Sequence, residues 1–199
     1  MCKGPILRHL NDENCRVLLL SLRNAVEPIL ANNLLPHFTD HSVRHSDRIV
    51  GLVDSLLNPL ANGDTRPTEK ELVVLYSACY LHDIGMQYER AGDTAVIHQL
   101  DLPQPWSDLQ QDTRRDLLRE HHHEISAELV RASVRAEHPP IGLQLNDQFE
   151  PGCIASLCEA HAIETRSDRY RELTEDGPGI RMQFLLSQLN CNVMGNWYW

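Results

Sequence analysis

Residues 72–85 of this chain read L-V-V-L-Y-S-A-C-Y-L-H-D-I-G, and this stretch decides the fold. Its first ten residues are almost all apolar, which is typical of a helix buried on every side. Thr68, with Glu71 three residues later, forms a capping-box pattern that marks the start of this helix. The sequence therefore predicts a buried helix from Thr68 to Leu81 that carries the adjacent pair His82 and Asp83 at its C-terminal end.

This histidine and aspartate pair is the strongest functional feature of the sequence. An imidazole and a carboxylate side by side can bind one divalent metal ion through two types of donor. The C-terminal end of a helix dipole disfavours negative charge, and the apolar surroundings add a desolvation cost, so Asp83 needs a compensating cation. The alternative is a purely structural hydrogen bond between His82 and Asp83.

Helical periodicity continues outward from this stretch in both directions, and strand-like alternation is nearly absent. The chain therefore belongs to the all-α class, and at 199 residues it fits a single-domain helical bundle. Besides the helix at residues 68–81, helices are expected at residues 15–34, 42–57, 107–119, 125–134, 154–163 and 180–189. Loops are expected at residues 59–64, 139–140 and 164–179, and residues 92–105 are irregular or hold a short helix.

The composition limits the location and the partners. Hydrophobic residues make up 42% and charged residues 23% of the chain, and no apolar run approaches the roughly 20 residues that span a bilayer. The N-terminal sequence lacks the apolar stretch of a secretion signal, so we expect a cytoplasmic protein with no membrane contact. The net charge of -10 argues against nucleic acid as a partner. The six cysteines contain no C-x-x-C pair and are expected to be free thiols.

The other notable histidines lie at the edges of apolar helical segments, at positions 41, 45, 121–123 and 161. His41 and His45 are four residues apart and so share one helix face. The H-x-x-x-H pattern of zinc proteases needs a glutamate after the first histidine, and Ser42 stands there instead. Simpler interpretations remain open: His41 as a residue at the start of a helix, two of the histidines at 121–123 as surface residues, and His161 as a core residue bonded to a carbonyl.

Four segments in this order resemble the HD superfamily of metal-dependent phosphohydrolases. They are F-T-D-H-S-V-R-H-S-D-R-I-V (38–50), L-Y-S-A-C-Y-L-H-D-I-G-M (75–86), R-E-H-H-H-E-I-S-A-E-L-V (119–130) and I-A-S-L-C-E-A-H (154–161). The resemblance covers residues 38–189 and leaves residues 190–199 as an atypical tail. More narrowly, the chain is similar to HD domains at the front of bacterial proteins that carry an Hsp90-like ATPase module.

The resemblance implies a bundle fold, a divalent metal (Mn, Fe, Ni, Co, Mg or Zn) and a set of site residues. The implied metal ligands are His45, His82, Asp83, His122 and His161. Of these, Asp83, His122 and His161 would also take part in catalysis, the two histidines by binding a second metal ion or the substrate phosphate. The implied substrate-binding residues are His41, Arg48 and Arg119.

The end of the chain departs from the family pattern. An aspartate near the end of the family's last helix completes the metal site, whereas no acidic residue follows Asp176 here, and Asn190, Asn192 and Val193 stand in that region. Two functions follow: a phosphohydrolase acting on nucleotides or other phosphate esters, or a catalytically degenerate domain with a regulatory metal- or nucleotide-binding role in a larger assembly. The expected partners are a phosphate-containing small molecule and a protein partner or a second copy. A helical interaction protein with incidental histidines is the third alternative.

Overall fold

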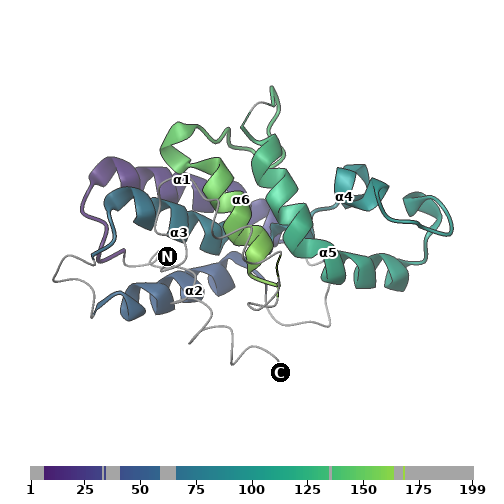
Figure 1. Cartoon of the computed structure of the whole chain (residues 1–199), viewed down its shortest axis with the longest axis horizontal. Coiled ribbons are helices and arrows are strands. Elements are labelled where there is room, and N and C mark those ends of the chain that lie inside the picture. Colours follow the sequence, from purple (N-terminus) through teal and green to yellow (C-terminus); the bar gives the residue numbers. More distant parts are fainter. Residues whose placement is uncertain are drawn as a thin grey trace.

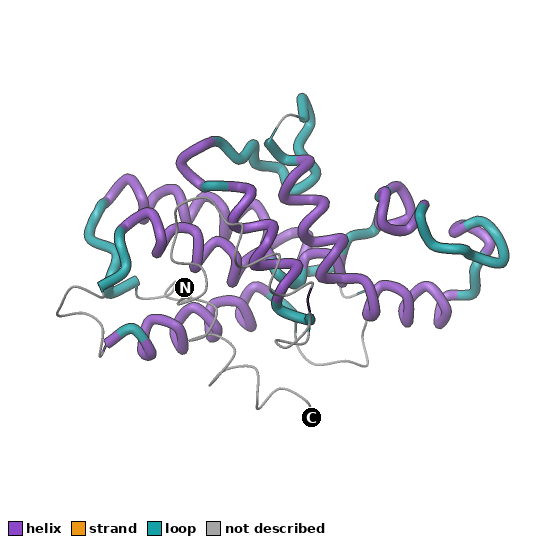
Figure 2. The backbone as a smooth tube through the Cα atoms, in the orientation of Figure 1, coloured by secondary structure: helices purple, strands orange, loops and turns teal. Residues whose placement is uncertain are grey.

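The computed structural model describes residues 7–32, 34, 41–58, 66–134, 136–163 and 168. Within these residues the regular structure is entirely helical, and Figure 2 shows helices joined by loops with no strand in the described part of the chain. The α-helices are α1 (Glu13–Leu30), α2 (Val43–Leu56), α3 (Glu69–Leu81), α4 (Ala95–His98), α5 (Gln111–Ala132) and α6 (Pro151–Ala160). Short 3-10 helices are η2 (Ile84–Gln87), η3 (Ala91–Asp93), η4 (Trp106–Asp108) and η5 (Asp147–Phe149). The predicted all-α class is confirmed.

Helix α3 is the core of the bundle, as its apolar sequence predicts. Every residue of α3 from Glu71 to Leu81 is buried, and the helix packs against α1, α2 and α6. The capping box is formed: the Thr68 hydroxyl accepts from the Glu71 N–H, and the Glu71 carboxylate accepts from the Thr68 N–H at 2.7 Å. The helix thus begins and ends where the sequence predicts, and His82 and Asp83 follow it directly.

Helices α1 and α2 flank α3 and are joined to each other by an ion pair. Arg23 of α1 donates hydrogen bonds to both oxygens of the Asp47 carboxylate of α2, the shortest at 2.9 and 2.8 Å, and the Tyr80 hydroxyl of α3 donates to the same carboxylate at 3.0 Å. Helix α1 begins two residues before the predicted start because the Asp12 side chain accepts from the N–H groups of its first turn. It ends at Leu30, four residues earlier than predicted.

Helix α5 corrects the prediction of two separate helices at residues 107–119 and 125–134. The structure has one helix of 22 residues, because the intervening polar residues include no glycine or proline and so do not interrupt it. The apolar periodicity lapses at residues 120–124 because His122 is a polar residue on the buried face. Figure 1 shows the first half of α5 and α4 projecting from the rest of the bundle.

Helix α6 packs against both α3 and α5 and completes the described core. It begins at Pro151, three residues before the predicted start, in a position where proline is favoured because its missing N–H has no helical partner. Glu150, just before it, has a left-handed backbone (φ 47°) and forms an ion pair with Lys70 near the start of α3. His161 follows the last residue of α6.

Four expectations lie outside the described residues: the loop at 59–64, the loop at 164–179 apart from residue 168, the helix at 180–189 and the tail at 190–199. Among the helices that are described, none has the length and apolar character that crossing a membrane requires.

Candidate metal centre

Helix ends bring the candidate ligands together around Asp83, which is 5% exposed. His82 and Asp83 follow α3, and His161 follows α6, so the C-terminal ends of two neighbouring helices meet here. His45 lies in the first turn of α2, and His122 lies in the middle of α5. His45 and His82 therefore both lie beside Asp83, but the donor atom of His82 belongs to neither set of side chains that lies close enough to hold one ion.

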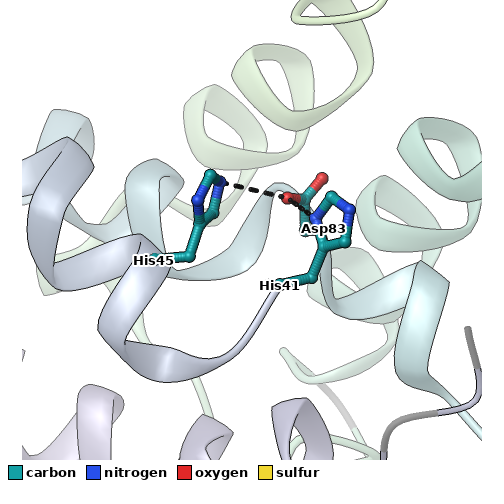
Figure 3. Close-up of side chains that lie close together, drawn as sticks. All are labelled: His41, His45 and Asp83. Atoms are coloured by element: carbon teal, nitrogen blue, oxygen red, sulfur yellow. Dashed lines mark hydrogen bonds and ion pairs between the residues drawn. The ribbon is translucent and has the colours of Figure 1, made fainter. Parts of the chain in front are cut away.

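One oxygen of the Asp83 carboxylate, Oδ2, faces three histidines. His41 Nδ1 and His82 Nε2 each lie 2.9 Å from it, and His45 Nε2 lies 3.8 Å from it. Figure 3 shows the rings of His41 and His45, from the start of α2 and the residues before it, turned towards this carboxylate. The donor atoms of His41, His45 and Asp83 all lie within 4.8 Å of one another, so they form a first candidate ligand group.

The other carboxylate oxygen, Oδ1, faces a second pair of histidines. His122 Nε2 lies 3.6 Å and His161 Nε2 lies 3.7 Å from Oδ1, and the two Nε2 atoms are 3.0 Å apart. The donor atoms of Asp83, His122 and His161 form a second group within 4.8 Å. Asp83 thus belongs to both groups, with one oxygen directed to each.

Backbone carbonyls fix which ring nitrogen of three histidines faces Asp83. The Nδ1 atoms of His82, His122 and His161 lie 3.1, 2.7 and 2.6 Å from the carbonyl oxygen of the residue three positions earlier in each case. A carbonyl oxygen only accepts, so each Nδ1 carries the hydrogen and donates it. Orientation of a ligand histidine by a hydrogen bond from its other nitrogen is the common arrangement in metal sites.

The second group consequently holds three acceptors and no donor. Burial lowers the pKa of His122 to about 4, and burial together with the neighbouring His82 lowers the pKa of His161 to about 3, so both rings are neutral at neutral pH. With hydrogen on Nδ1, each Nε2 presents a lone pair, and the two lone pairs face each other and Oδ1. These two lone pairs and the carboxylate oxygen repel one another unless a cation lies between them.

Asp83 is ionised despite its burial. Burial opposes its ionisation, but the positive charge of His82 and the hydrogen bonds from His41 and His82 outweigh this effect and hold the pKa of Asp83 well below its ordinary value. For His82, burial likewise opposes the charged form, and the adjacent Asp83 carboxylate outweighs it and raises the pKa of His82. The site therefore presents a buried carboxylate surrounded by imidazoles.

The spacing of these atoms fits a divalent ion. Two donors that each lie about 2.1 Å from one ion are about 3.0 Å apart at a right angle and about 3.4 Å apart at a tetrahedral angle. The separations of the imidazole nitrogens from Asp83 run from 2.9 to 3.8 Å and bracket these values. Histidine nitrogen and carboxylate oxygen are both ordinary ligands of such ions.

The remaining site predictions have mixed outcomes. His41, expected in the substrate pocket, lies beside Asp83 among the candidate ligands. It precedes α2, so the expectation that it shares a helix face with His45 is wrong. Of residues 121–123, only His122 contacts Asp83; His121 pairs with Glu124 at 2.8 Å.

Arg48 lies one turn beyond His45, and Arg119 one turn before His122; both are exposed, and their roles in substrate binding stay predictions. Asn190 and Asn192 lie outside the described residues.

Comparison with known proteins agrees with this site. No curated protein and no solved structure matches the chain. Residues 35–187, well over half of the chain, match the family model described as HD-CE. These residues include every candidate ligand described above, and the chain therefore belongs to the HD-CE family, an HD-type helical domain.

Proposed function

We propose that this chain is a metal-dependent phosphohydrolase acting on nucleotides or other phosphate esters. The observation that carries the proposal is the division of the Asp83 carboxylate between two groups of imidazoles, with Oδ2 facing one and Oδ1 facing the other. This arrangement suits two divalent ions that share one carboxylate. Two ions about 3.5–4 Å apart are a common device for phosphoryl transfer, because both the attacking and the leaving oxygen are stabilised.

The chain divides its ligands between the two positions. His41 and His45 would hold one ion with Asp83 Oδ2, and His122 and His161 would hold the other with Asp83 Oδ1. His82 contacts Asp83 Oδ2 but belongs to neither group. Imidazole suits iron, nickel and zinc, whereas magnesium and calcium prefer oxygen ligands. Four imidazoles with one carboxylate therefore favour a transition metal over magnesium.

The charge of the site supports an anionic substrate. When bound, divalent ions favour ionisation of a water near neutral pH and neutralise phosphoryl oxygens. Asp83 is the one carboxylate within both ligand groups found among the described residues, and the histidines in them bind metal as neutral rings. Most of the positive charge would remain uncompensated by these side chains, which favours a phosphate group as the ligand. The exposed Arg48 and Arg119, one turn from His45 and His122, would orient it.

The experiment is a phosphatase assay of the full chain loaded with manganese, nickel or cobalt. Nucleotides and an aryl phosphate are offered to the wild type, to Asp83→Ala and to Asp112→Ala, whose aspartate side chain is 90% exposed on α5 and serves as the matched control. We expect phosphate release by the wild type and the control, and its loss together with bound metal in Asp83→Ala. Equal activity in Asp83→Ala and the wild type would refute the proposal.

One feature of the sequence favours a second function, a non-catalytic domain that binds metal or nucleotide and regulates an assembly. Residues 177–199, the region in which the resemblance places the family's last metal aspartate, contain no acidic residue. This function predicts stoichiometric metal in the wild type, loss of that metal in Asp83→Ala, and no phosphate release from any substrate offered. The same assay, with metal analysis of each protein, separates the two functions.

The proposal extends to partners and location. The resemblance to HD domains that precede Hsp90-like ATPase modules supports a role beside such a module or in a homo-oligomer, in the cytoplasm. Light scattering of the purified chain, alone and mixed with a purified Hsp90-like ATPase, tests both associations. A monomer that does not bind the ATPase would refute this extension.

A further inference from the structure

A buried serine links the two parts of the backbone that carry Asp83 and His122. Ser126 of α5 is fully buried, and its Oγ accepts a hydrogen bond from the Gly85 N–H of η2 at 2.9 Å, between groups that are both buried. Gly85 lies two residues after Asp83, and Ser126 lies four residues, about one helical turn, after His122. The hydrogen bond therefore joins the turn that presents Asp83 to the helix that presents His122.

The contact that this hydrogen bond spans is a close approach of two backbones. A Cβ atom on Gly85 would lie 2.3 Å from the His122 carbonyl oxygen and 3.0 Å from the Ser126 nitrogen. At this spacing, loss of the Ser126 hydroxyl leaves the buried Gly85 N–H without an acceptor. The N–H then stays unpaired, or η2 moves relative to α5 until it finds another partner.

Movement of η2 relative to α5 changes the second ligand group selectively. The separation of His122 Nε2 from Asp83 Oδ1, 3.6 Å, depends on the spacing between these two elements. The histidines of the first ligand group lie on α2 and just before it, and this contact does not join α2 to α5. A perturbation of the contact therefore weakens one ion site more than the other.

We propose that Ser126 is a positioning residue that sets the distance between Asp83 and His122 and so builds the second ion site. The inference rests on the proposed function, because it assumes that the two ligand groups bind metal. Ser126 acts on the ligands through the hydrogen bond that its hydroxyl accepts from the Gly85 N–H.

The experiment measures Mn²⁺ binding by the full-length chain with Ser126→Ala, Ser126→Thr and Ser77→Ala. Ser77 of α3 is the matched control, because it is equally buried and its hydroxyl has no hydrogen-bond partner within the described part of the chain. Ser126→Ala should weaken the second ion by about 10–100-fold, the usual effect of removing a group that orients ligands, and leave the first ion nearly unchanged. Ser126→Thr retains the hydroxyl and should restore binding, and Ser77→Ala should bind as the wild type does.

Electron paramagnetic resonance adds a readout that a general loss of stability would not change. Two Mn²⁺ ions that share a carboxylate are exchange-coupled, so the wild type and Ser126→Thr should give the spectrum of a coupled pair, and Ser126→Ala that of isolated ions. If Ser126→Ala does not fold, Ser126→Cys serves as a second variant, because its side chain has a similar volume and its thiol is a weaker hydrogen-bond acceptor than a hydroxyl. In reduced form, Ser126→Cys should also give the spectrum of isolated ions.

Three results would overturn the inference alone. The first is Ser126→Ala binding both ions as the wild type does, and the second is an equal loss at both sites. The third is a wild type that binds a single ion, which leaves a metal-dependent hydrolase standing but removes the second site. A wild type that binds no ion refutes the proposed function together with the inference, so the two failures are distinguishable.

Discussion

Replacing Gly85 with alanine would place a methyl group inside the contact between η2 and α5. The new Cβ would lie 2.3 Å from the His122 carbonyl oxygen, whereas ordinary contacts begin at 3.4 Å, so the two elements must separate by 1.1 Å. The opposing atom belongs to the backbone of a helix and cannot rotate away as a side chain does. Insertion of a methyl group into a packed core costs about 1–3 kcal/mol, and this geometry lies at the upper end of that range.

The expected loss is therefore about 3 kcal/mol of unfolding free energy, to which the stretched hydrogen bond from Gly85 to Ser126 adds about 1 kcal/mol. For a chain of this length, the total of about 4 kcal/mol corresponds to a fall in Tm of about 8–16 °C. Urea and thermal unfolding followed by circular dichroism measure both quantities.

Gly51→Ala is the matched control for this measurement. Gly51 lies on α2, and a Cβ atom added there would have no atom within 4 Å. Alanine is the better helix former, so the control should gain about 0.5–1 kcal/mol. Unfolding of Gly85→Ala within about 1 kcal/mol of the wild type would refute the close packing of η2 on α5.

Three further predictions concern metal, pH and capping. Mn²⁺ at about a hundred times its Kd should raise the free energy of unfolding by about 2.7 kcal/mol, measured in urea; EDTA should reverse this gain, and a gain of equal size in Asp83→Ala would contradict the assigned ligands. In EDTA, lowering the pH from about 7 to about 5 should destabilise the chain. Burial holds the pKa of His122 at about 4 and that of His161 at about 3 in the folded protein. In the unfolded chain both histidines bind protons below about pH 6.5, so a fall in pH favours the unfolded state. Urea titrations should show a smaller pH effect in His161→Gln, and an unchanged effect would exclude this cause. Thr68→Ala should cost about 1 kcal/mol in the same assay, because it removes the hydroxyl that caps α3, and Thr68→Ser should cost much less; equal losses would mean that the cap is not responsible.

The sequence predicts the parts of the structure that depend on local signals. The capping box and the apolar run predict both ends of α3 correctly, and His82 and Asp83, which follow it, point to the candidate site. His45, His122 and His161 were assigned through the resemblance; the structure places all three beside Asp83, and their roles as metal ligands stay predictions.

Other features depend on contacts that local signals do not contain. The continuity of α5 was missed because a buried polar residue, His122, interrupts the apolar periodicity without interrupting the helix. The place of His41 beside Asp83 depends on how the chain approaches α2, across 42 residues of sequence. The contact between Gly85 and Ser126 joins residues 41 apart, and only the packed structure brings them together.

The carbonyl oxygens that receive the Nδ1 hydrogens belong to Cys79, Arg119 and Cys158, and only the main chain of these residues takes part. Every amino acid supplies the same oxygen, so evolution is free to exchange these three side chains as far as the direction of the rings is concerned. Many metalloproteins instead rely on a dedicated acidic residue behind each histidine, which a single mutation can remove. Here the orientation of three imidazole rings is set by backbone carbonyls of the helices, so it is kept as long as the helices form.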